Sequence, residues 1–279
     1  MTTTTCHRFR IGSLECAIVD DGDLLLPPEI VFPATRRAEW PPLELDAEGR
    51  YVCPIGCMLV WAGRELVLLD TGNGTTPGNP WPGGGKLPLA LAEAGVAPAD
   101  IDVVVLSHAH ADHTGGITVL DGGRLELAFP RARHVLQQKD WDYYTAPERA
   151  ARFGYVRDSL LLLAERGRLA LVDGEVAITS HVDVVPTPGH SPGHCVVRVS
   201  SMGETALYLG DLVHHRVHFE QPDLVRERDV IPELVPSARQ KIAQLALHTS
   251  ALLAVPHEAF PGLGRLASDG ERLVFRPVV

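Results

Sequence analysis

The clearest pattern along the chain is a series of short apolar runs separated by polar, Gly-rich or Pro-rich breaks. The run IDVVVLS, residues 101–107, is a continuous apolar stretch between polar residues, which indicates a strand buried on both faces. We expect the first 20 residues to form a strand and 251–258 to form the last one. Further strands are expected at 51–63, 64–74, 133–138, 169–174, 176–189, 194–200 and 205–211.

Helical spacing of apolar residues appears in fewer segments. Residues 87–101 have this spacing until Gly95 and Pro98 end it, and 236–250 begin with Pro and Ser, as helices often do. We expect 137–167 to be mostly helical and 115–120, GGITVL, to begin a helix. The order of strands and helices predicts an α/β fold with two sheets packed together and helices outside.

Domain organisation follows from length and from one unusual segment. A chain of 279 residues can form one large domain, and we expect a single domain over 1–279. Residues 22–50 are rich in Pro and acidic residues with isolated apolar positions, so they are expected to form an extended arm rather than core.

Charge and hydropathy exclude several classes of partner. The chain has 25 Lys and Arg against 35 Asp and Glu, a formal charge of −10, and no basic run, which argues against nucleic acid. No apolar stretch reaches the length of a membrane span. The first residues, MTTTTCHRFRIGS, do not resemble a secretory signal, so a cytoplasmic protein is expected.

The five cysteines do not suggest a disulfide framework. They are few, odd in number and scattered over a long chain. Cys53 and Cys57 have the spacing of a zinc half-site, but no second pair exists. We therefore favour small buried hydrophobic residues at the entry of a strand.

The chemistry concentrates at the ends of the predicted strands. The stretch VVVLSHAHADHTGG, residues 103–116, puts His108 and His110 on one side of a strand end, whereas Asp112 and His113 diverge. A same-side pair and a diverging pair suit two metal ions better than one. Imidazole and carboxylate together suit zinc, iron or manganese.

Three more residues of metal-ligand type follow later strands. They are His190 in PTPGHSPGH, Asp211 in LYLGD and His257 in LLAVPHE. Strand ends hold ligands on rigid supports, which a metal site requires. Each residue alone is better explained as an ordinary loop residue, but together and in this order they indicate one site.

These motifs resemble the metallo-β-lactamase superfamily, whose pattern is H-x-H-x-D-H followed by H, D and H. LLDTGNG also matches the family's early Asp-Thr-Gly element, and the resemblance runs from about residue 50 to 265. It implies a four-layer αβ/βα sandwich of two mixed sheets with outer helices. The site would lie at the edge where the two sheets meet.

The resemblance also implies a role for each residue. The first metal would be bound by His108, His110 and His190, the second by Asp112, His113 and His257, and Asp211 would bridge them. Asp70 of the Asp-Thr-Gly element would orient a ligand histidine, although a simple turn residue explains it equally well. The cofactors would be two divalent metal ions, with zinc favoured over iron or manganese.

The implied activity is that of a metal-dependent hydrolase of lactones or small carboxylic esters. A metal-bound hydroxide would attack the carbonyl carbon. Asp112 would be mainly a ligand that can also orient the water or pass a proton. Within the superfamily the chain resembles the lactonase and methyl parathion hydrolase branch, since His214 lies three residues after Asp211 where many lactonases have tyrosine. His214 is therefore the candidate donor to the substrate oxygen, with a solvated loop histidine as the alternative.

Other readings remain open. An organophosphate triester hydrolase would use the same site, and the sequence does not decide between the two substrates. A glyoxalase II-like thioesterase is less favoured, because this chain shows no basic C-terminal patch of the kind those enzymes use. A non-catalytic metal-binding module is also less favoured, because it would not need all seven ligands. We expect a small-molecule substrate, whereas the arm at 22–50 could serve homodimer contacts or cover the pocket. Candidate pocket residues are Trp141, Tyr143, Tyr144, Phe153 and Phe219, for which ordinary packing is the alternative.

Overall fold

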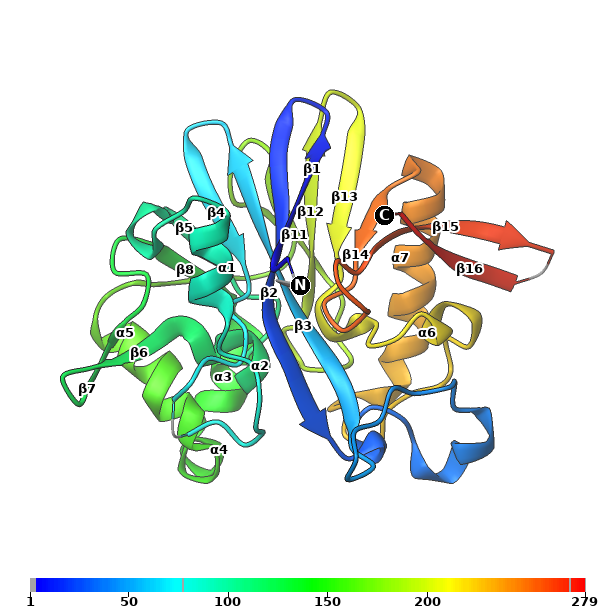
Figure 1. The fold of residues 1–279 in the computed structure, drawn as a ribbon, viewed down its shortest axis with the longest axis horizontal. Helices are drawn as coiled ribbons and strands as arrows, with labels where there is room; N and C mark the ends of the chain where they lie inside the picture. Colours follow the sequence, from blue (N-terminus) through cyan, green and yellow to red (C-terminus); the bar gives the residue numbers. More distant parts are fainter. Residues whose placement is uncertain (1–3, 77, 271, 279) are drawn as a thin grey trace.

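The computed structural model describes residues 4–76, 78–270 and 272–278, which form two seven-stranded sheets between layers of helices (Figure 1). The expected four-layer α/β sandwich is confirmed. The first sheet has the order β1 (Cys6–Ile11), β2 (Leu14–Leu26), β3 (Tyr51–Ala62), β4 (Glu65–Leu69), β5 (Val103–Val105), β8 (Arg133–Gln137) and β9 (Leu169–Val172). The second has the order β10 (Val176–Ala177), β11 (Val182–Pro186), β12 (Cys195–Ser201), β13 (Glu204–Tyr208), β14 (Leu252–Ala254), β15 (Leu263–Asp269) and β16 (Arg272–Pro277).

Both sheets are mixed. In the first, β1 to β4 are antiparallel and β4, β5, β8 and β9 are parallel. In the second, only the β13–β14 pair is parallel. The parallel pairs bring the ends of β4 and β5, and of β13 and β14, to the same sheet edges, and the predicted ligands other than His190, which follows β11, lie just beyond these ends.

The helices cover the outer face of each sheet. Figure 1 shows the helices of the first half on one side and those of the second half on the other. The first group is α1 (Leu87–Glu93), α2 (Ala111–Thr114), α3 (Gln138–Thr145), α4 (Pro147–Arg152), a π-helical turn at Val156–Leu161 and α5 (Leu162–Glu165). The second group is α6 (Val217–Glu220) and α7 (Val235–Thr249). Among the described residues, no helix is long and apolar enough to cross a membrane.

Strand alternation explains the layers. In β5, Val104 packs under the helices of the first half, whereas Val103 and Val105 face the second sheet. In β3, Leu59 likewise faces the helices of the first half, and Met58 faces the second sheet. The prediction of a strand buried on both faces is therefore confirmed for 103–105, where all three side chains are buried.

Several predicted elements differ from the structure at turns. The first predicted strand is a hairpin, because Gly12 adopts a positive φ and reverses the chain. Residues 118–121 form the strand β6, paired with β7 (Arg124–Leu127), rather than a helix. The strand predicted at 176–189 is β10 and β11, and 251–258 is not the last strand because β15 and β16 follow.

Residues 22–50 differ from the extended arm that was expected to lie outside the core. Their first five residues complete β2, and two 3₁₀ turns follow at Pro28–Ile30 and Ala34–Glu39. Leu24, Leu26, Val31 and Phe32 are buried in a small apolar cluster with residues of β3. The segment is therefore packed against the sheet along its first third, and its surface turns come later.

Candidate functional site

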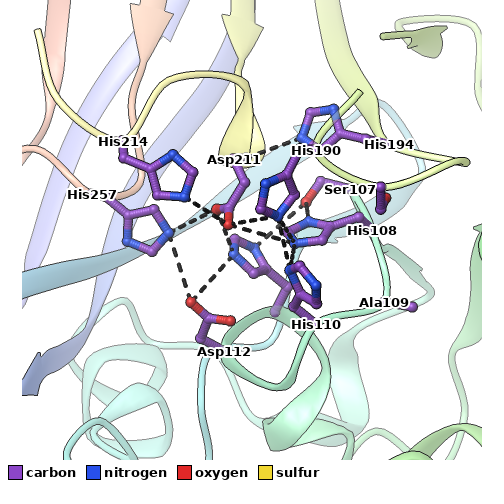
Figure 2. A network of polar contacts seen from close by, with 12 residues as sticks. Ser107, His108, Ala109, His110, Asp112, His190, His194, Asp211, His214 and His257 are labelled. Carbon is purple, nitrogen blue, oxygen red and sulfur yellow. Dashed lines mark hydrogen bonds and ion pairs between the residues drawn. The ribbon is translucent and has the colours of Figure 1, made fainter. Parts of the chain in front are cut away.

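The seven predicted ligands lie together in loops beyond the strand ends (Figure 2). His108 and His110 follow β5 in an extended segment, and Asp112 and His113 lie on the one-turn helix α2. The other three follow β11, β13 and β14. The chain therefore assembles the cluster from four segments that are far apart in sequence.

The ligand atoms form two groups with one shared residue. His108, His110, His190 and Asp211 form the first group, and Asp112, His113, Asp211 and His257 form the second, each with all ligand atoms within 4.8 Å. In the first group, His190 Nε2 lies 2.8 Å from His110 Nδ1 and 3.1 Å from His108 Nε2. Cys53 and Cys57 are in neither group, which agrees with their interpretation as buried hydrophobic residues.

Asp211 lies between the two groups. Its Oδ1 is 2.8 Å from the Nε2 atoms of His113 and His257, and its Oδ2 is 3.0 Å from His190 Nε2. Each carboxylate oxygen thus faces one group. Burial acts to raise the pKa of Asp211, but the surrounding histidines, His214 first, hold it well below its usual range.

The arrangement of protons in the cluster fits bound cations. His113 Nδ1 lies 2.7 Å from Asp70 Oδ2, and His257 Nδ1 lies 2.7 Å from the carbonyl oxygen of Pro54. In each ring Nδ1 therefore holds the proton and Nε2 presents a lone pair inward. His113 Nε2 is buried and lacks a hydrogen bond of good geometry even to Asp211. Converging lone pairs of this kind repel one another unless a cation lies between them, and the nitrogen and carboxylate donors suit zinc, iron or manganese.

Asp70 supports the second group. It lies directly after β4 with a φ of 58°, and its carboxylate accepts bonds from the backbone and hydroxyl of Ser107, both at 2.7 Å. The Tyr208 hydroxyl donates to Asp70 Oδ2 at 2.9 Å. Asp70 therefore connects a ligand histidine with both sheets, which is the orienting position that the family resemblance implied.

Three more side chains support the cluster; the sequence suggested Tyr144 only as a pocket residue and gave no signal for Asp140 and Asp229. Asp229 lies 2.8 Å from His190 Nδ1, and the Tyr144 hydroxyl lies 2.6 Å from His110 Nε2. Asp140, on α3, accepts bonds from the backbone of Ala109 and from the hydroxyl of Ser191, at 2.8 and 2.9 Å. These contacts fix the orientation of ligand rings and hold two ligand loops together.

His194 and His214 occupy different positions. His194 Nε2 accepts a bond from the backbone N–H of Asp211 at 3.0 Å, so it holds the loop that carries the shared carboxylate. His214 Nε2 lies 2.9 Å from Asp211 Oδ2, and the ring is buried rather than solvated. Burial and the nearby Arg226 guanidinium hold the pKa of His214 well below its usual range, so the ring is neutral.

A cavity of about 460 Å³ opens onto both ligand groups. Tyr143, Tyr144 and Phe153 line it as expected, whereas Trp141 and Phe219 do not. Four of the predicted ligands and two of their neighbours also line the cavity: His110, Asp112, Asp211 and His257, with His214 and Arg226. The apolar lining includes Leu24, Leu26, Ile30, Val31 and Trp81, so the segment 22–50 forms part of the wall.

Comparison with known proteins agrees with this geometry. A sequence model described as Metallo-beta-lactamase superfamily matches residues 50–247. N-acyl homoserine lactonase AttM of Azorhizobium caulinodans is 28% identical over 231 residues, which cover 75% of this chain and 83% of that protein.

Solved structures are similar over the whole chain. AidC, a dizinc quorum-quenching lactonase in complex with a product, is 26% identical with a TM-score of 0.81 and covers 99% of both chains. The hydrolase AbOPH, of the beta lactamase superfamily, is 22% identical with a TM-score of 0.84 and covers 100% of this chain and 99% of its own. At that identity the second similarity concerns the fold alone.

Proposed function

This chain belongs to the metallo-beta-lactamase superfamily, and on that premise we propose that it is a two-metal hydrolase that opens lactones. The observation that carries the proposal is the pair of ligand groups sharing Asp211 at the end of a largely apolar cavity. Similarity to an N-acyl homoserine lactonase and to a dizinc lactonase favours a lactone as substrate and zinc as the metal.

The proposed ligand sets follow the two groups. His108, His110 and His190 would hold one ion, and Asp112, His113 and His257 the other. Asp211 would contribute one oxygen to each, which its two sets of short contacts support. Two bound divalent cations would supply a water of lowered pKa and polarise the scissile carbonyl.

The remaining chemistry belongs to side chains at the cavity. Asp112 is the one ligand carboxylate with part of its surface open, at 17% exposure, so its carboxylate can take a proton from water and return it to the leaving alkoxide. His214 lines the cavity and is neutral at pH 7, and its Nε2 contacts both Asp211 Oδ2, at 2.9 Å, and the Arg226 guanidinium. We assign it the donor role toward the substrate oxygen.

A substrate panel tests the proposal. Zinc-loaded enzyme is assayed with short- and long-chain N-acyl homoserine lactones, an aryl ester and an aryl phosphotriester, before chelation, after it and after zinc is restored. We expect the highest kcat/KM on lactones, lost on chelation and recovered with zinc. Dominant phosphotriester turnover would instead assign the alternative substrate, and turnover that survives chelation would contradict the metal site.

Variants connect that activity to the ligand cluster. His110→Ala and Asp112→Ala should fold, as judged by circular dichroism, but lose hydrolysis and bound metal at their group. His248→Ala is the matched control, because this exposed histidine on α7 lies outside the cavity. Near-normal turnover in either site variant would refute the ligand assignment.

A further inference from the structure

The cavity wall carries an unusual concentration of positive charge. Four arginines line it, Arg149, Arg152, Arg226 and Arg228, whereas Asp112 and Asp211 are the only carboxylates among the described residues that line it. Both carboxylates belong to the ligand groups, so their charge would be neutralised by bound cations. The chain as a whole has a formal charge of −10, and the cavity is therefore opposite in sign to the molecule around it.

The arginines approach the cavity from two layers of the fold. Arg149 and Arg152 are three residues apart on α4, so they lie on one face of that helix. Arg228 belongs to the loop after α6, in the second helical layer. Figure 1 places α4 and α6 on opposite sides of the sheets.

The guanidinium groups of Arg149 and Arg152 contact aromatic rings rather than carboxylates. The guanidinium carbon of Arg149 lies 3.6 Å from the ring centroid of Tyr143, and that of Arg152 lies 5.4 Å from the centroid of Phe153. Stacking limits the motion of a guanidinium and leaves its N–H groups free to bind an anion. Within the part of the chain that the structure describes, Arg149, Arg152 and Arg228 form no ion pair with a carboxylate, whereas Arg216 pairs with Glu258.

Arg226 extends this charge toward the ligand groups. Its side chain is only 9% exposed, with Nη1 at 3.5 Å from Asp211 Oδ2. Its buried Nε forms an ion pair with Asp229 Oδ1 at 3.8 Å, which is too long for a hydrogen bond. Arg226 also lines the cavity, so its guanidinium can donate a hydrogen bond to a polar substrate atom there.

Apolar side chains share the cavity with the arginines and the ligand groups. Leu26, Ile30 and Trp81 line the cavity together with the arginines and the ligand residues. This distribution suits a substrate with its scissile bond at the ligand groups, an apolar spacer and a charged end. A purely aliphatic tail would offer no hydrogen-bond acceptor to the guanidinium N–H groups.

Building on the lactone hydrolysis proposed above, we propose that the preferred substrate is a lactone or ester whose acyl side chain ends in a carboxylate or another oxyanion. Arg149, Arg152 and Arg228 bind that end, because guanidinium groups donate paired N–H bonds to oxyanions. Arg226 donates to polar atoms nearer the scissile bond.

Matched substrates test this inference. N-hexanoyl and N-adipoyl homoserine lactone have the same acyl length, and they differ in ending with a methyl or a carboxylate. A third lactone with a terminal trimethylammonium group reverses the charge. We expect kcat/KM to be about tenfold higher for the adipoyl than for the hexanoyl lactone, since several partly exposed guanidinium groups each add a several-fold factor. The trimethylammonium lactone should be the poorest, and the preference should shrink in 0.5 M NaCl because salt screens exposed charges.

Variants locate the preference. The triple variant Arg149→Gln, Arg152→Gln and Arg228→Gln should bring the adipoyl-to-hexanoyl ratio of kcat/KM close to one. The control variant Arg124→Gln, Arg272→Gln and Arg276→Gln removes the same charge at exposed positions outside the cavity and should keep the ratio. All six positions are half-buried or exposed, so both proteins should fold.

The outcomes separate this inference from the proposed function. If turnover is chelator-sensitive but shows no preference for the adipoyl lactone, the anionic substrate class is overturned and lactone hydrolysis still stands. The same conclusion follows if the triple variant keeps the preference. Absence of chelator-sensitive turnover on every lactone overturns the proposed function and this inference with it.

Discussion

At the scale of single residues, Asp211 determines the geometry of the centre. One buried carboxylate faces four imidazole nitrogens at 2.8 to 3.0 Å, two through Oδ1 and two through Oδ2. A neutral amide at this position would offer one oxygen only, so a single substitution would remove the connection between the groups. The DLVHH sequence that carries it also places His214 on the same carboxylate.

The role proposed for His214 leads to a residue-level prediction. In His214→Phe, the metal content should be unchanged because His214 belongs to neither ligand group, but kcat should fall about 10²-fold through loss of a donor to the substrate oxygen. Metal analysis and steady-state kinetics measure the two effects separately.

The conservative variant His214→Gln gives the matched comparison. It keeps an N–H donor of similar reach, so part of the lost kcat should return. An unchanged kcat in His214→Phe, or equal losses in both variants, would remove the donor role from this residue.

At the scale of elements, the loops that carry ligands pack backbone against backbone. Gly115 lies so close to Asn73 that a Cβ would meet its carbonyl oxygen at 1.9 Å, and a Cβ on Gly116 would meet that of Thr71 at 2.0 Å. The Thr71 N–H in turn donates to the carbonyl oxygen of His113 at 2.9 Å. The glycines after the histidine cluster begin a 3₁₀ turn at Gly115–Ile117, and their small size lets α2 approach the loop after β4.

Asp21 fixes the other side of that loop and gives a prediction for this element. Its buried carboxylate accepts the backbone N–H groups of Asn73 and Leu87, both at 2.8 Å. Asp21→Ala should leave these buried donors unpaired and lower the free energy of unfolding by about 2–4 kcal/mol. Urea denaturation followed by fluorescence measures the loss.

Asp23→Ala is the control, since Asp23 is two residues away in β2 but exposed. It should change the free energy of unfolding by less than about 0.5 kcal/mol. Equal urea midpoints for the two variants would show that the Asp21 bonds do not stabilise the loop.

At the scale of the whole molecule, three apolar layers hold four layers of secondary structure together. The middle layer joins the two sheets and the outer layers join each sheet to its helices. The Tyr208 hydroxyl of the second sheet lies 3.0 Å from the Gly56 carbonyl oxygen of the first sheet and 2.9 Å from Asp70 Oδ2. The metal centre therefore depends on the relative position of the two sheets.

Stability of the whole fold should decrease in mild acid because of His134, which is buried on β8. Burial lowers its pKa from 6.5 to about 4 in the folded chain. Between pH 6.5 and 4 the unfolded chain binds a proton that the folded chain does not, so the free energy of unfolding falls as the pH falls. This one group lowers the free energy of unfolding by on the order of 3 kcal/mol, and the loss is complete near pH 4.

Denaturation of His134→Leu at several pH values tests this prediction. The variant should lose less stability than the unsubstituted protein between pH 6.5 and 4, whereas His248→Leu, at an exposed position, should follow the unsubstituted protein. Parallel curves for all three proteins would show that His134 does not carry the acid sensitivity.

The sequence predicted the elements where one local signal dominates. The apolar run at 103–105 is a strand, since both faces of β5 are covered, and the spacing at 236–250 agrees with α7. The errors lie where a turn reverses the chain at Gly12, at 118–121 where a strand replaces the expected helix, and where apolar and polar residues mix, as in β15 and β16. Residues 22–50 were misjudged because their isolated apolar side chains become core only by packing against β3.

The sequence by itself determined the donor atoms. Their types and spacings are local properties, and ligands of this chemistry at the ends of buried strands have few other uses. Only the tertiary structure decided which side chains support them and what the cavity accepts. Asp140, Tyr144, Asp229 and Arg226 are ordinary residues in their own segments and acquire a role because the fold brings distant loops within hydrogen-bond distance. Such contacts depend on how the two sheets and their helices pack, and no local pattern encodes that arrangement.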